Sequence, residues 1–573
     1  MTEDRTSSGP QRMVSVGGYL AERLHQLGVT DVFAVPGDYN LALLDELLKD
    51  QRLAMIGCCN ELNAGYAADG YARGRGVGVV ITTFSVGALS AINAIAGAHA
   101  ENLPVLLVSG GPNTRSKHEH ELLHHTIDTT DTGYQRQIFE HVTACAVTID
   151  HLEDAAAKID EAIRAAIDVG KPAYIEIAAN LAAREIPAPE PMRFGRATSD
   201  ADALDAAIAA VAEVVDAARK PVLLAGSQLR SFGAIEAFAD LADASRYAVA
   251  VMPDAKGFVS EQRDSFIGEY WGPIGDPGVA SAVEAADVVL AVGPVFTDYT
   301  TVGHSCLLSP DRLVVIGPRQ VSVKGRTFSG VAMADVLAGL SAKVAANPTS
   351  LETFRRTQRP LAAEPGVEAS DAVTARVLAE RVEAMLTPTT TLIAETGDSW
   401  FHATKMRLPE GASFEIQMKY GSIGWSVGAA LGAAVAGGGD RQVVAMIGDG
   451  SFQMTAQEVS TMVRLGVPVT LFVVNNGGYT IEVEIHDGPY NVIQNWRYAE
   501  LIDVFSTSGG PATGVRVTTV GELDAAVTAA ASAGGVNLIE VVIDRDDCSD
   551  ELLDWGSRVL ANNTRAPHDT IIL

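Results

Sequence analysis

The sequence contains little cysteine and comparatively little positive charge. Five cysteines occur among 573 residues, and they form neither a Cys-x-x-Cys motif nor a metal-binding spacing. Such a sparse, odd set is typical of a reducing compartment such as the cytoplasm and argues against a disulfide scaffold. Asp and Glu outnumber Lys and Arg by 71 to 42, which gives a net charge of −29. This excess argues against nucleic acid or an anionic membrane as a partner.

Membrane spans and nucleotide-binding loops are also missing from the pattern. The two uncharged stretches, 77–100 and 421–439, contain Gly, Ser, Thr, Asn and His between them, so buried strand–turn–helix segments are expected there. The polar N-terminus, 1–13, has no apolar signal-peptide core and is predicted to be a disordered tail. There is no P-loop, and the loop 226–233 lacks the GxGxxG pattern of a dinucleotide site.

The length of the chain and its two Pro-rich stretches predict three domains. A chain of 573 residues is too long for one hydrophobic core. Two Pro-rich polar stretches, 186–200 and 347–370, are predicted linkers, which places the domains at 14–190, 200–346 and 368–573. Each domain alternates apolar strands with amphipathic helices. This alternation predicts α/β domains with doubly wound parallel sheets covered on both faces.

The first and third domains share one pattern. A strand from Val79, a helix and a strand after Pro104 have the same spacing as the strand from Val443, its helix and the strand after Pro468. In this superposition Ser85 falls at the position of Asp449. We therefore expect two domains of like fold, only one of which carries a metal ligand at this point.

A metal-binding pattern stands at the ends of two neighbouring strands of the third domain. Gly448-Asp449-Gly450-Ser451 follows an apolar run, and Asn476 follows the next one. In a βαβ crossover these strand ends lie side by side, where α/β sheets bind ligands. The oxygens of Asp449 and Asn476 and the carbonyl of Gly478 suit Mg²⁺. Gly450 and Ser451 open a helix, where free N–H groups favour phosphate, so a diphosphate held through Mg²⁺ is predicted.

Other motifs have both structural and chemical interpretations. Glu61 begins a helix of small residues and could simply stabilise its N-terminus. His124 and His125 could be structural or a metal pair, although adjacent side chains usually diverge. Asp38 stands in a turn after a strand, and Glu482 could be an exposed helix charge.

Taken together, these motifs resemble the thiamine-diphosphate-dependent 2-keto acid decarboxylases, and within them the bacterial type that acts on pyruvate. The resemblance covers nearly the whole chain apart from the N-terminal tail. It rests, besides the metal motif, on the stretches 36–40, 58–63, 122–126, 394–401, 424–427, 480–483 and 486–491.

The resemblance implies thiamine diphosphate and Mg²⁺ as cofactors. Asp449, Asn476 and the Gly478 carbonyl would hold the metal. Glu61 would hydrogen-bond N1′ of the aminopyrimidine and so activate the cofactor, because a desolvated carboxyl can share its proton with that nitrogen. Ile423 would wedge between the two cofactor rings. The remaining cofactor contacts would come from Thr396, the Gly421 carbonyl, Gly450, Ser451 and Ile481.

The implied reaction is the non-oxidative decarboxylation of pyruvate to acetaldehyde and CO₂, with the thiazolium as electron sink. Asp38, His124, His125 and Glu482 would serve the departure of CO₂ and the proton transfers, with Asp38 and Glu482 in the main role. A small substrate pocket would be lined by Tyr299, Trp400, Ile481 and Ile485. Larger acids (indolepyruvate, phenylpyruvate or branched-chain 2-keto acids) are the alternative, because apolar discrimination is only about 1–3 kcal/mol per methylene.

The resemblance also implies an assembly. The family forms its active site between the first domain of one subunit and the third of another, so a homodimer is the minimum and a homotetramer the usual form. A carboligase such as acetolactate synthase would share the metal motif but not the His doublet with Thr-Ile-Glu, and a scaffold protein would be expected to lose Glu61 or a metal ligand. The chain departs from the family at Gly477, where relatives often have a larger residue and the added glycine loosens the loop.

Overall fold

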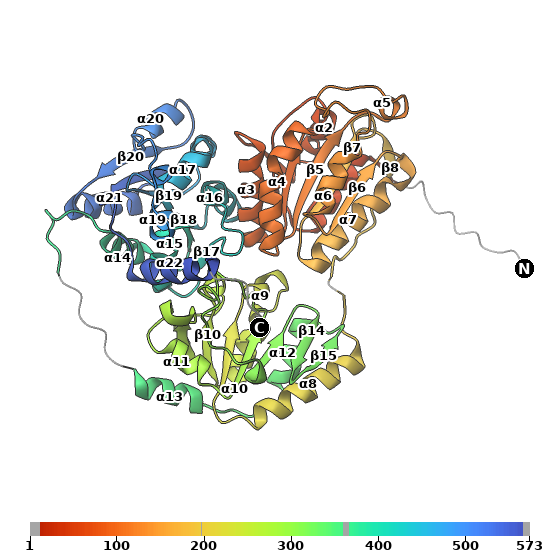
Figure 1. Ribbon diagram of the computed structural model, residues 1–573. Coiled ribbons are helices and arrows are strands. Elements are labelled where there is room, and N and C mark those ends of the chain that lie inside the picture. Colours follow the sequence, from red (N-terminus) through yellow and green to blue (C-terminus); the bar gives the residue numbers. More distant parts are fainter. Residues whose placement is uncertain (1–11, 196, 359–365, 565–573) are drawn as a thin grey trace, which may run out of the picture. The chain divides into compact units, whose positions relative to one another are not determined.

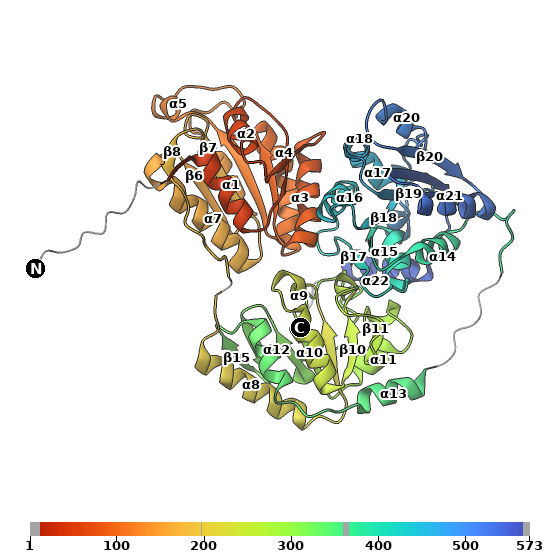
Figure 2. The same cartoon turned by 180° about the vertical axis from the view of Figure 1, so that it is seen from behind.

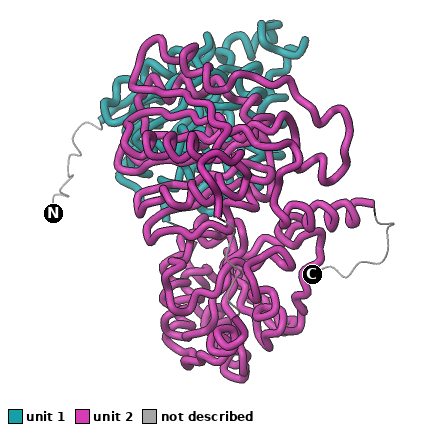
Figure 3. Tube along the Cα trace, turned by 90° about the vertical axis from the view of Figure 1, so that its left-hand side faces the viewer, with its two compact units in different colours: residues 1–196, 431–436 teal, residues 197–430, 437–573 magenta. Residues whose placement is uncertain are grey.

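The computed structural model describes residues 12–195, 197–358 and 366–564, in which the strands form three large sheets (Figure 1). The chain divides into two compact units (Figure 3). One unit consists of the described residues up to 195 together with Leu431–Ala436, and it holds the first sheet. The other unit holds the second and third sheets. The three domains expected from the sequence therefore correspond to three sheets, two of which belong to one compact unit.

The first sheet has the strand order β3-β2-β4-β5-β7-β6, and its paired strands are parallel. Every residue of β4 and β5 is buried, as expected for a strand with helices on both faces. The strands are β2 (Asp31–Ala34), β3 (Ala54–Gly57), β4 (Gly78–Thr82), β5 (Val105–Gly111), β6 (Cys145–Ile149) and β7 (Ala173–Ala178). Its helices are α1 (Val16–Gln26), α2 (Leu41–Leu48), α3 (Glu61–Arg75), α4 (Val86–Ala100), α5 (Thr114–His118), α6 (Tyr134–Glu140) and α7 (Ala155–Val169).

The third sheet repeats this arrangement strand for strand. Its order is β17-β16-β18-β19-β21-β20, again with parallel pairs, which confirms the like fold of the first and third domains. The strands are β16 (Thr390–Ala394), β17 (Ser413–Glu415), β18 (Gln442–Gly448), β19 (Val469–Asn475), β20 (Ala512–Val517) and β21 (Val536–Val542). The helices, seen from both sides in Figures 1 and 2, are α14 (Ala375–Met385), α15 (Asp398–Lys405), α16 (Trp425–Ala436), α17 (Asp449–Thr455), α18 (Val459–Leu465), α19 (Thr480–Ile485), α20 (Leu501–Phe505), α21 (Val520–Ser532) and α22 (Asp550–Asn563).

The middle sheet departs from the all-parallel expectation at one edge. Its order is β11-β10-β9-β12-β13-β14-β15, and the last two strands join antiparallel. The two-residue loop between them has positive φ at both Lys324 and Gly325, the geometry that a tight hairpin requires. The strands are β9 (Pro221–Ala225), β10 (Ala248–Val251), β11 (Phe266–Glu269), β12 (Val288–Val292), β13 (Leu313–Ile316), β14 (Gln320–Val323) and β15 (Arg326–Ser329). The helices are α8 (Ala201–Asp216), α9 (Gln228–Ser231), α10 (Ile235–Ser245), α11 (Val279–Glu284) and α12 (Met333–Ser341).

Two segments expected to be irregular contain regular structure. Met13, assigned to the disordered tail, begins β1 (Met13–Ser15), which pairs with β8 (Glu185–Pro187); residues 1–11 of that tail lie outside the described residues. The second predicted linker contains α13 (Thr349–Thr357), because Leu351 packs into the core of the middle domain; residues 359–365 of this linker are not among the described ones.

The two uncharged stretches fold as expected. Residues 77–100 form β4 and α4, and residues 421–439 form a turn and α16. Within the described residues, no helix has the length and apolarity that crossing a bilayer requires. All five cysteines are free thiols.

Candidate functional site

Residues that could bind a metal or cofactor follow the carboxyl ends of three adjacent strands of the third sheet. β16, β18 and β19 are parallel neighbours, so their carboxyl ends meet at one edge. Thr396 follows β16, Asp449 follows β18 and Asn476 follows β19. The register pairs Ala394 with Met446 and Gly448 with Val474, which brings these polar residues to the same level of the sheet.

Asp449 is fully buried and its carboxylate joins two loops. Oδ1 accepts the N–H of Gly450 at 2.7 Å, and Oδ2 accepts the N–H of Gly477 at 2.7 Å. Burial raises the pKa of Asp449 to about 6, and the backbone N–H groups of Gly477, Gly450, Asn476 and Gly478 oppose the rise. A cation would favour the charged form of this carboxylate.

Asn476 offers the oxygen that a metal needs. Its Nδ2 donates to Thr480 Oγ1, whereas its Oδ1 is buried and has no hydrogen-bond partner within the described residues. The backbone of Gly478 is held beside Val492 by an isolated bridge. A buried carboxylate and a free amide oxygen on adjacent strand ends are hard oxygen donors, so the residues present fit Mg²⁺.

A cavity of about 390 Å³ opens over these strand ends. Most of the residues that the sequence assigned to cofactor or substrate in the third domain line it, together with Tyr299 of the middle domain. They are Tyr299, Thr396, Gly421, Ile423, Gly450, Ser451, Asn476, Gly478, Ile481, Glu482 and Ile485. Two assigned residues do not line it: Asp449, which is buried below the strand end, and Trp400.

Trp400 belongs to an aromatic layer behind the cavity. Its ring centroid lies 6.0 Å from that of Tyr299, and Tyr299 in turn lies 4.9 Å from Trp555. The backbone oxygen of Tyr299 accepts the indole N–H of Trp271 at 2.8 Å, which fixes the loop that carries Tyr299. Trp400 therefore restricts the pocket indirectly, because it fills the space behind Tyr299.

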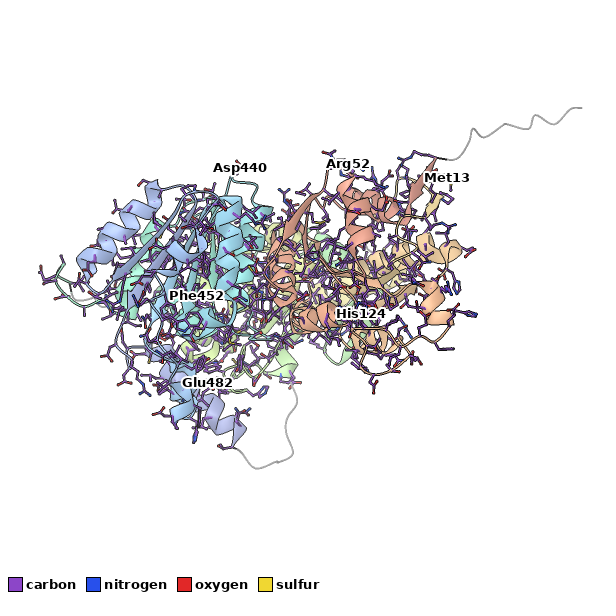
Figure 4. All side chains as sticks on the ribbon, turned by 90° about the horizontal axis from the view of Figure 1, so that it is seen from above. Met13, Arg52, His124, Asp440, Phe452 and Glu482 are labelled. Atoms are coloured by element: carbon purple, nitrogen blue, oxygen red, sulfur yellow. The ribbon has the colours of Figure 1, made fainter. Side chains whose placement is uncertain are left out.

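The short helix α19 brings Thr480 and three larger residues to the cavity. Ile481, Glu482 and Ile485 lie on it at the cavity wall. Glu482, labelled in Figure 4, is exposed in spite of this position. Its charge contributes, after burial and Asp298, to the raised pKa of Tyr299.

In the other compact unit, Asp38 and the two adjacent histidines converge. The Nε2 of His124 lies 2.6 Å from Oδ2 of Asp38, and the Nε2 of His125 lies 3.8 Å from Oδ1 of the same carboxylate. The ring of Tyr39 stacks on His124 with a centroid distance of 4.9 Å. The side chains of Asp38, His124 and His125 present possible metal-ligand atoms within 4.8 Å of one another.

The backbone explains why the two histidines do not diverge. His125 has φ of 66°, a left-handed conformation outside regular secondary structure. Its ring therefore lies only 4.6 Å, centroid to centroid, from that of His124. The divergence expected for adjacent side chains does not occur here.

Glu61 is the first residue of α3. The side chain of Asn60 caps this helix by accepting the N–H of Asn63 at 2.8 Å. A Cβ at Gly87 would lie 3.0 Å from Oε1 of Glu61, so a larger residue at the start of α4 would push this carboxylate aside by a few tenths of an ångström. Glu61 is partly exposed, which leaves its carboxylate accessible to a ligand.

The cavity also contains residues that the sequence analysis did not assign. They are Ala375, Leu378, Gly397, Asp398, Ser399, His402, Met446, Gly448, Val474, Tyr479, Thr480, Ile543 and Asp547. A signal for part of this set was present, because Gly397-Asp398-Ser399 follows β16 at the same sheet edge as Asp449. His402 is 3.0 Å from Asp398, which raises the pKa of this imidazole against the effect of burial.

Comparison with known families agrees with this geometry. Residues 14–132 match the family described as thiamine pyrophosphate enzyme, N-terminal TPP binding domain. Residues 208–341 match the central domain of the same enzymes, and residues 385–541 match their C-terminal TPP binding domain.

Curated relatives match over almost the whole chain. Pyruvate decarboxylase 3 of Oryza sativa subsp. indica is 49% identical over 563 residues, which are 97% of this chain and 96% of the relative. Pyruvate decarboxylase 2 of Arabidopsis thaliana is 47% identical over 561 residues, 97% of this chain and 92% of the relative. Both of these relatives are plant proteins.

Proposed function

The chain belongs to the pyruvate decarboxylase family of thiamine pyrophosphate enzymes, and we propose on this premise that it decarboxylates pyruvate to acetaldehyde and CO₂ with thiamine diphosphate and Mg²⁺. The single observation that carries the proposal is that Asp449 and an Asn476 oxygen without a hydrogen-bond partner in the described part of the chain stand at adjacent strand ends beside the cavity. A diphosphate bridged by Mg²⁺ would satisfy both residues.

We assign the metal to Asp449, Asn476 and the Gly478 carbonyl. Thr396, Gly421, Ile423, Gly450, Ser451 and Ile481 would contact the cofactor, since all of them line the one cavity. Thiamine diphosphate, when bound, supplies the electron sink that accepts the electron pair released with CO₂. Glu61 would hold the proton at N1′ of the aminopyrimidine, and Gly87 leaves its carboxylate the room to do so.

Proton transfer is assigned to the acid and imidazole groups. The contact of 2.6 Å between His124 and Asp38 lets the carboxylate orient the imidazole. His125, 3.8 Å from the same carboxylate, would have to move to hydrogen-bond distance to relay a proton to it. Glu482 on the cavity wall would act on the same proton in concert with Asp38. These groups would protonate the product carbon and release acetaldehyde.

A small substrate is supported by the cavity wall. Tyr299, Ile481 and Ile485 line it, and Trp400 closes the space behind Tyr299. Larger 2-keto acids remain the second candidate, because α19 contributes only two aliphatic side chains to this wall.

The assembly is proposed to be a homodimer at least, and a homotetramer in full. The proposal rests on the resemblance, because the family forms its active site between the first domain of one subunit and the third domain of another. The free thiols support a cytoplasmic location.

The test is steady-state turnover of pyruvate, phenylpyruvate and indolepyruvate with thiamine diphosphate and Mg²⁺, measured by CO₂ release. We expect the highest kcat/KM for pyruvate. A higher kcat/KM for an aromatic 2-keto acid would reject the small substrate pocket, while the decarboxylation with thiamine diphosphate would stand. No release of CO₂ from any 2-keto acid would reject the decarboxylase. Joining two pyruvates to acetolactate also releases CO₂, so the organic product is identified as well, and acetolactate in place of acetaldehyde would replace the decarboxylase with a carboligase.

A further inference from the structure

A single buried carboxylate holds the turn that carries Ile423. Glu395 follows β16 and is fully buried. Its Oε2 accepts one hydrogen bond from the end of this turn, the Gly424 N–H at 3.0 Å, and two from the start of α16, the Ser426 N–H at 3.2 Å and the Ser426 Oγ at 2.6 Å. Its Oε1 accepts the N–H of Thr396 at 2.8 Å. The Glu395 carboxylate therefore connects Thr396, which lines the cavity, to the turn that carries Ile423.

Among the described residues, Glu395 has no basic partner. Its interactions within the described residues are these hydrogen bonds. Burial raises the pKa of Glu395, and the donors Ser426, Thr396 and Gly424 oppose that rise. Burying a carboxyl group without a cation costs free energy, which its hydrogen bonds offset only in part, so an apolar residue would suit a purely structural position better.

The turn itself needs such support because its backbone is unusual. Gly421 and Gly424 have φ of 62° and 87°, and a Cβ at Gly424 would lie 2.7 Å from the Cβ of Met454. The carbonyl of Gly424 accepts a hydrogen bond from Thr455 Oγ1 at 2.7 Å. Ile423, between the two glycines, lines the cavity.

Gln417 also supports the turn, because its Oε1 accepts the N–H of Ser422 at 2.8 Å. Gln417, Thr455 and Glu395 each make one hydrogen bond with the turn, and Glu395 makes two more with Ser426 at the start of α16. Glu395 therefore holds both the end of the turn and the start of the helix that follows Ile423.

We propose that Glu395 is a positioning residue for Ile423, and that it holds this side chain in the orientation that thiamine diphosphate requires. The proposal rests on the proposed function, in which Ile423 contacts the cofactor. A turn held in place before binding avoids the free-energy cost of ordering it on binding, so Glu395 would strengthen cofactor affinity and also turnover.

The test compares Glu395→Gln with the wild-type enzyme. The amide keeps the size of the carboxyl group but points an N–H group at one of the present donors, so at least one hydrogen bond is lost. In the cofactor-free protein, hydrogen–deuterium exchange at Gly424 and Ser426 should become faster. The Kd for thiamine diphosphate at saturating Mg²⁺ should rise, and kcat should fall, each by roughly tenfold to a hundredfold. The KM for pyruvate should stay within about twofold.

Ser426→Ala is the second variant, because it keeps the carboxylate and removes only one donor. It should change exchange and Kd in the same direction by a smaller factor, and it decides the question if Glu395→Gln does not fold. Glu284→Gln on α11 is the matched control, since its carboxylate accepts hydrogen bonds from Tyr270 and Leu307 and lines no part of the cavity. It should leave the turn and the Kd unchanged.

Unchanged exchange at the turn in both variants, or a Kd within about twofold of wild type in both, would overturn the proposal. Failure of the proposed reaction is a separate result. If the wild-type protein binds thiamine diphosphate and releases no CO₂, the reaction is rejected, while exchange and Kd still report on Glu395.

Discussion

The carboxylate of Asp449 accepts a hydrogen bond of 2.7 Å from the backbone N–H of Gly477. This bond joins the residue after β18 to the loop after β19. Gly477 has φ of 81°, and a Cβ there would meet no atom within 4 Å, so conformation rather than space favours glycine. The loop expected to be loosened by Gly477 is therefore tied to the metal-ligand candidate itself.

Asp449→Asn should weaken metal-dependent cofactor binding by at least about a hundredfold, because a neutral amide is a poorer ligand for Mg²⁺ than a carboxylate. Binding of thiamine diphosphate can be measured by calorimetry at several Mg²⁺ concentrations. Removal of Mg²⁺ from the wild-type protein with EDTA should reproduce the loss. Asp503→Asn, an exposed carboxylate on α20, is the control, and an equal effect there would contradict the assignment.

Asp38→Asn should lower kcat for pyruvate by about a hundredfold or more, which is the usual contribution of a positioned acid–base group. The Kd for thiamine diphosphate should remain nearly unchanged, since Asp38 contacts the histidines. The exposed Asp45→Asn on α2 controls for the charge change. A kcat close to wild type would remove Asp38 from the proton transfers.

Ile481→Ala should widen the cavity toward larger 2-keto acids. The ratio of kcat/KM for phenylpyruvate to that for pyruvate should increase by about tenfold to a hundredfold, because each apolar carbon contributes about 1–3 kcal/mol to discrimination. Val483→Ala lies on the same helix but not on the cavity, and it should leave the ratio unchanged. A shift of equal size in both variants would point to a general loosening of α19.

Glu269 should make stability depend on pH. It ends β11 and is buried, with the Nζ of Lys405 3.7 Å from its Oε2. Burial raises its pKa from 4.5 to about 8, while Lys405 opposes the rise. At pH values between 4.5 and about 8, Glu269 is protonated in the native state and ionised in the unfolded state. The free energy of unfolding therefore falls as pH rises, by up to about 1.4 kcal/mol per pH unit.

Glu269→Gln should remove this slope. The stabilising contribution of the wild-type carboxyl is complete below pH 4.5 and lost above about pH 8. The Tm of both proteins is measured between pH 6 and 9 at steps of roughly one pH unit. The difference in Tm, variant minus wild type, should increase as pH rises. The exposed Glu213→Gln on α8 should show no such trend. Parallel Tm curves for wild type and Glu269→Gln would show that Glu269 is ionised in the native state throughout.

Much of the fold was predictable because its signals are local. Apolar runs separated by Gly, Asp and Asn mark strands and their ends, and a parallel crossover brings successive ends to one edge. Asp449 and Asn476 could therefore be placed together from the sequence. The shared spacing of the first and third domains likewise predicted a like fold, which their common strand order confirms, whereas the antiparallel pair β14–β15 depends on the turn at Lys324 and Gly325.

The sequence by itself determined the order of the strands, the chemical types at their ends and the resemblance to a family, since these depend on neighbours along the chain. Tertiary structure alone decided how His124 and His125 meet, because that depends on the backbone at His125. It also decided that Trp400 lies behind the cavity and that Glu395 meets Gly424 and Ser426. The contacts of Trp400 and Glu395 join residues far apart in the chain, and packing selects them only when the sheet and its helices are assembled.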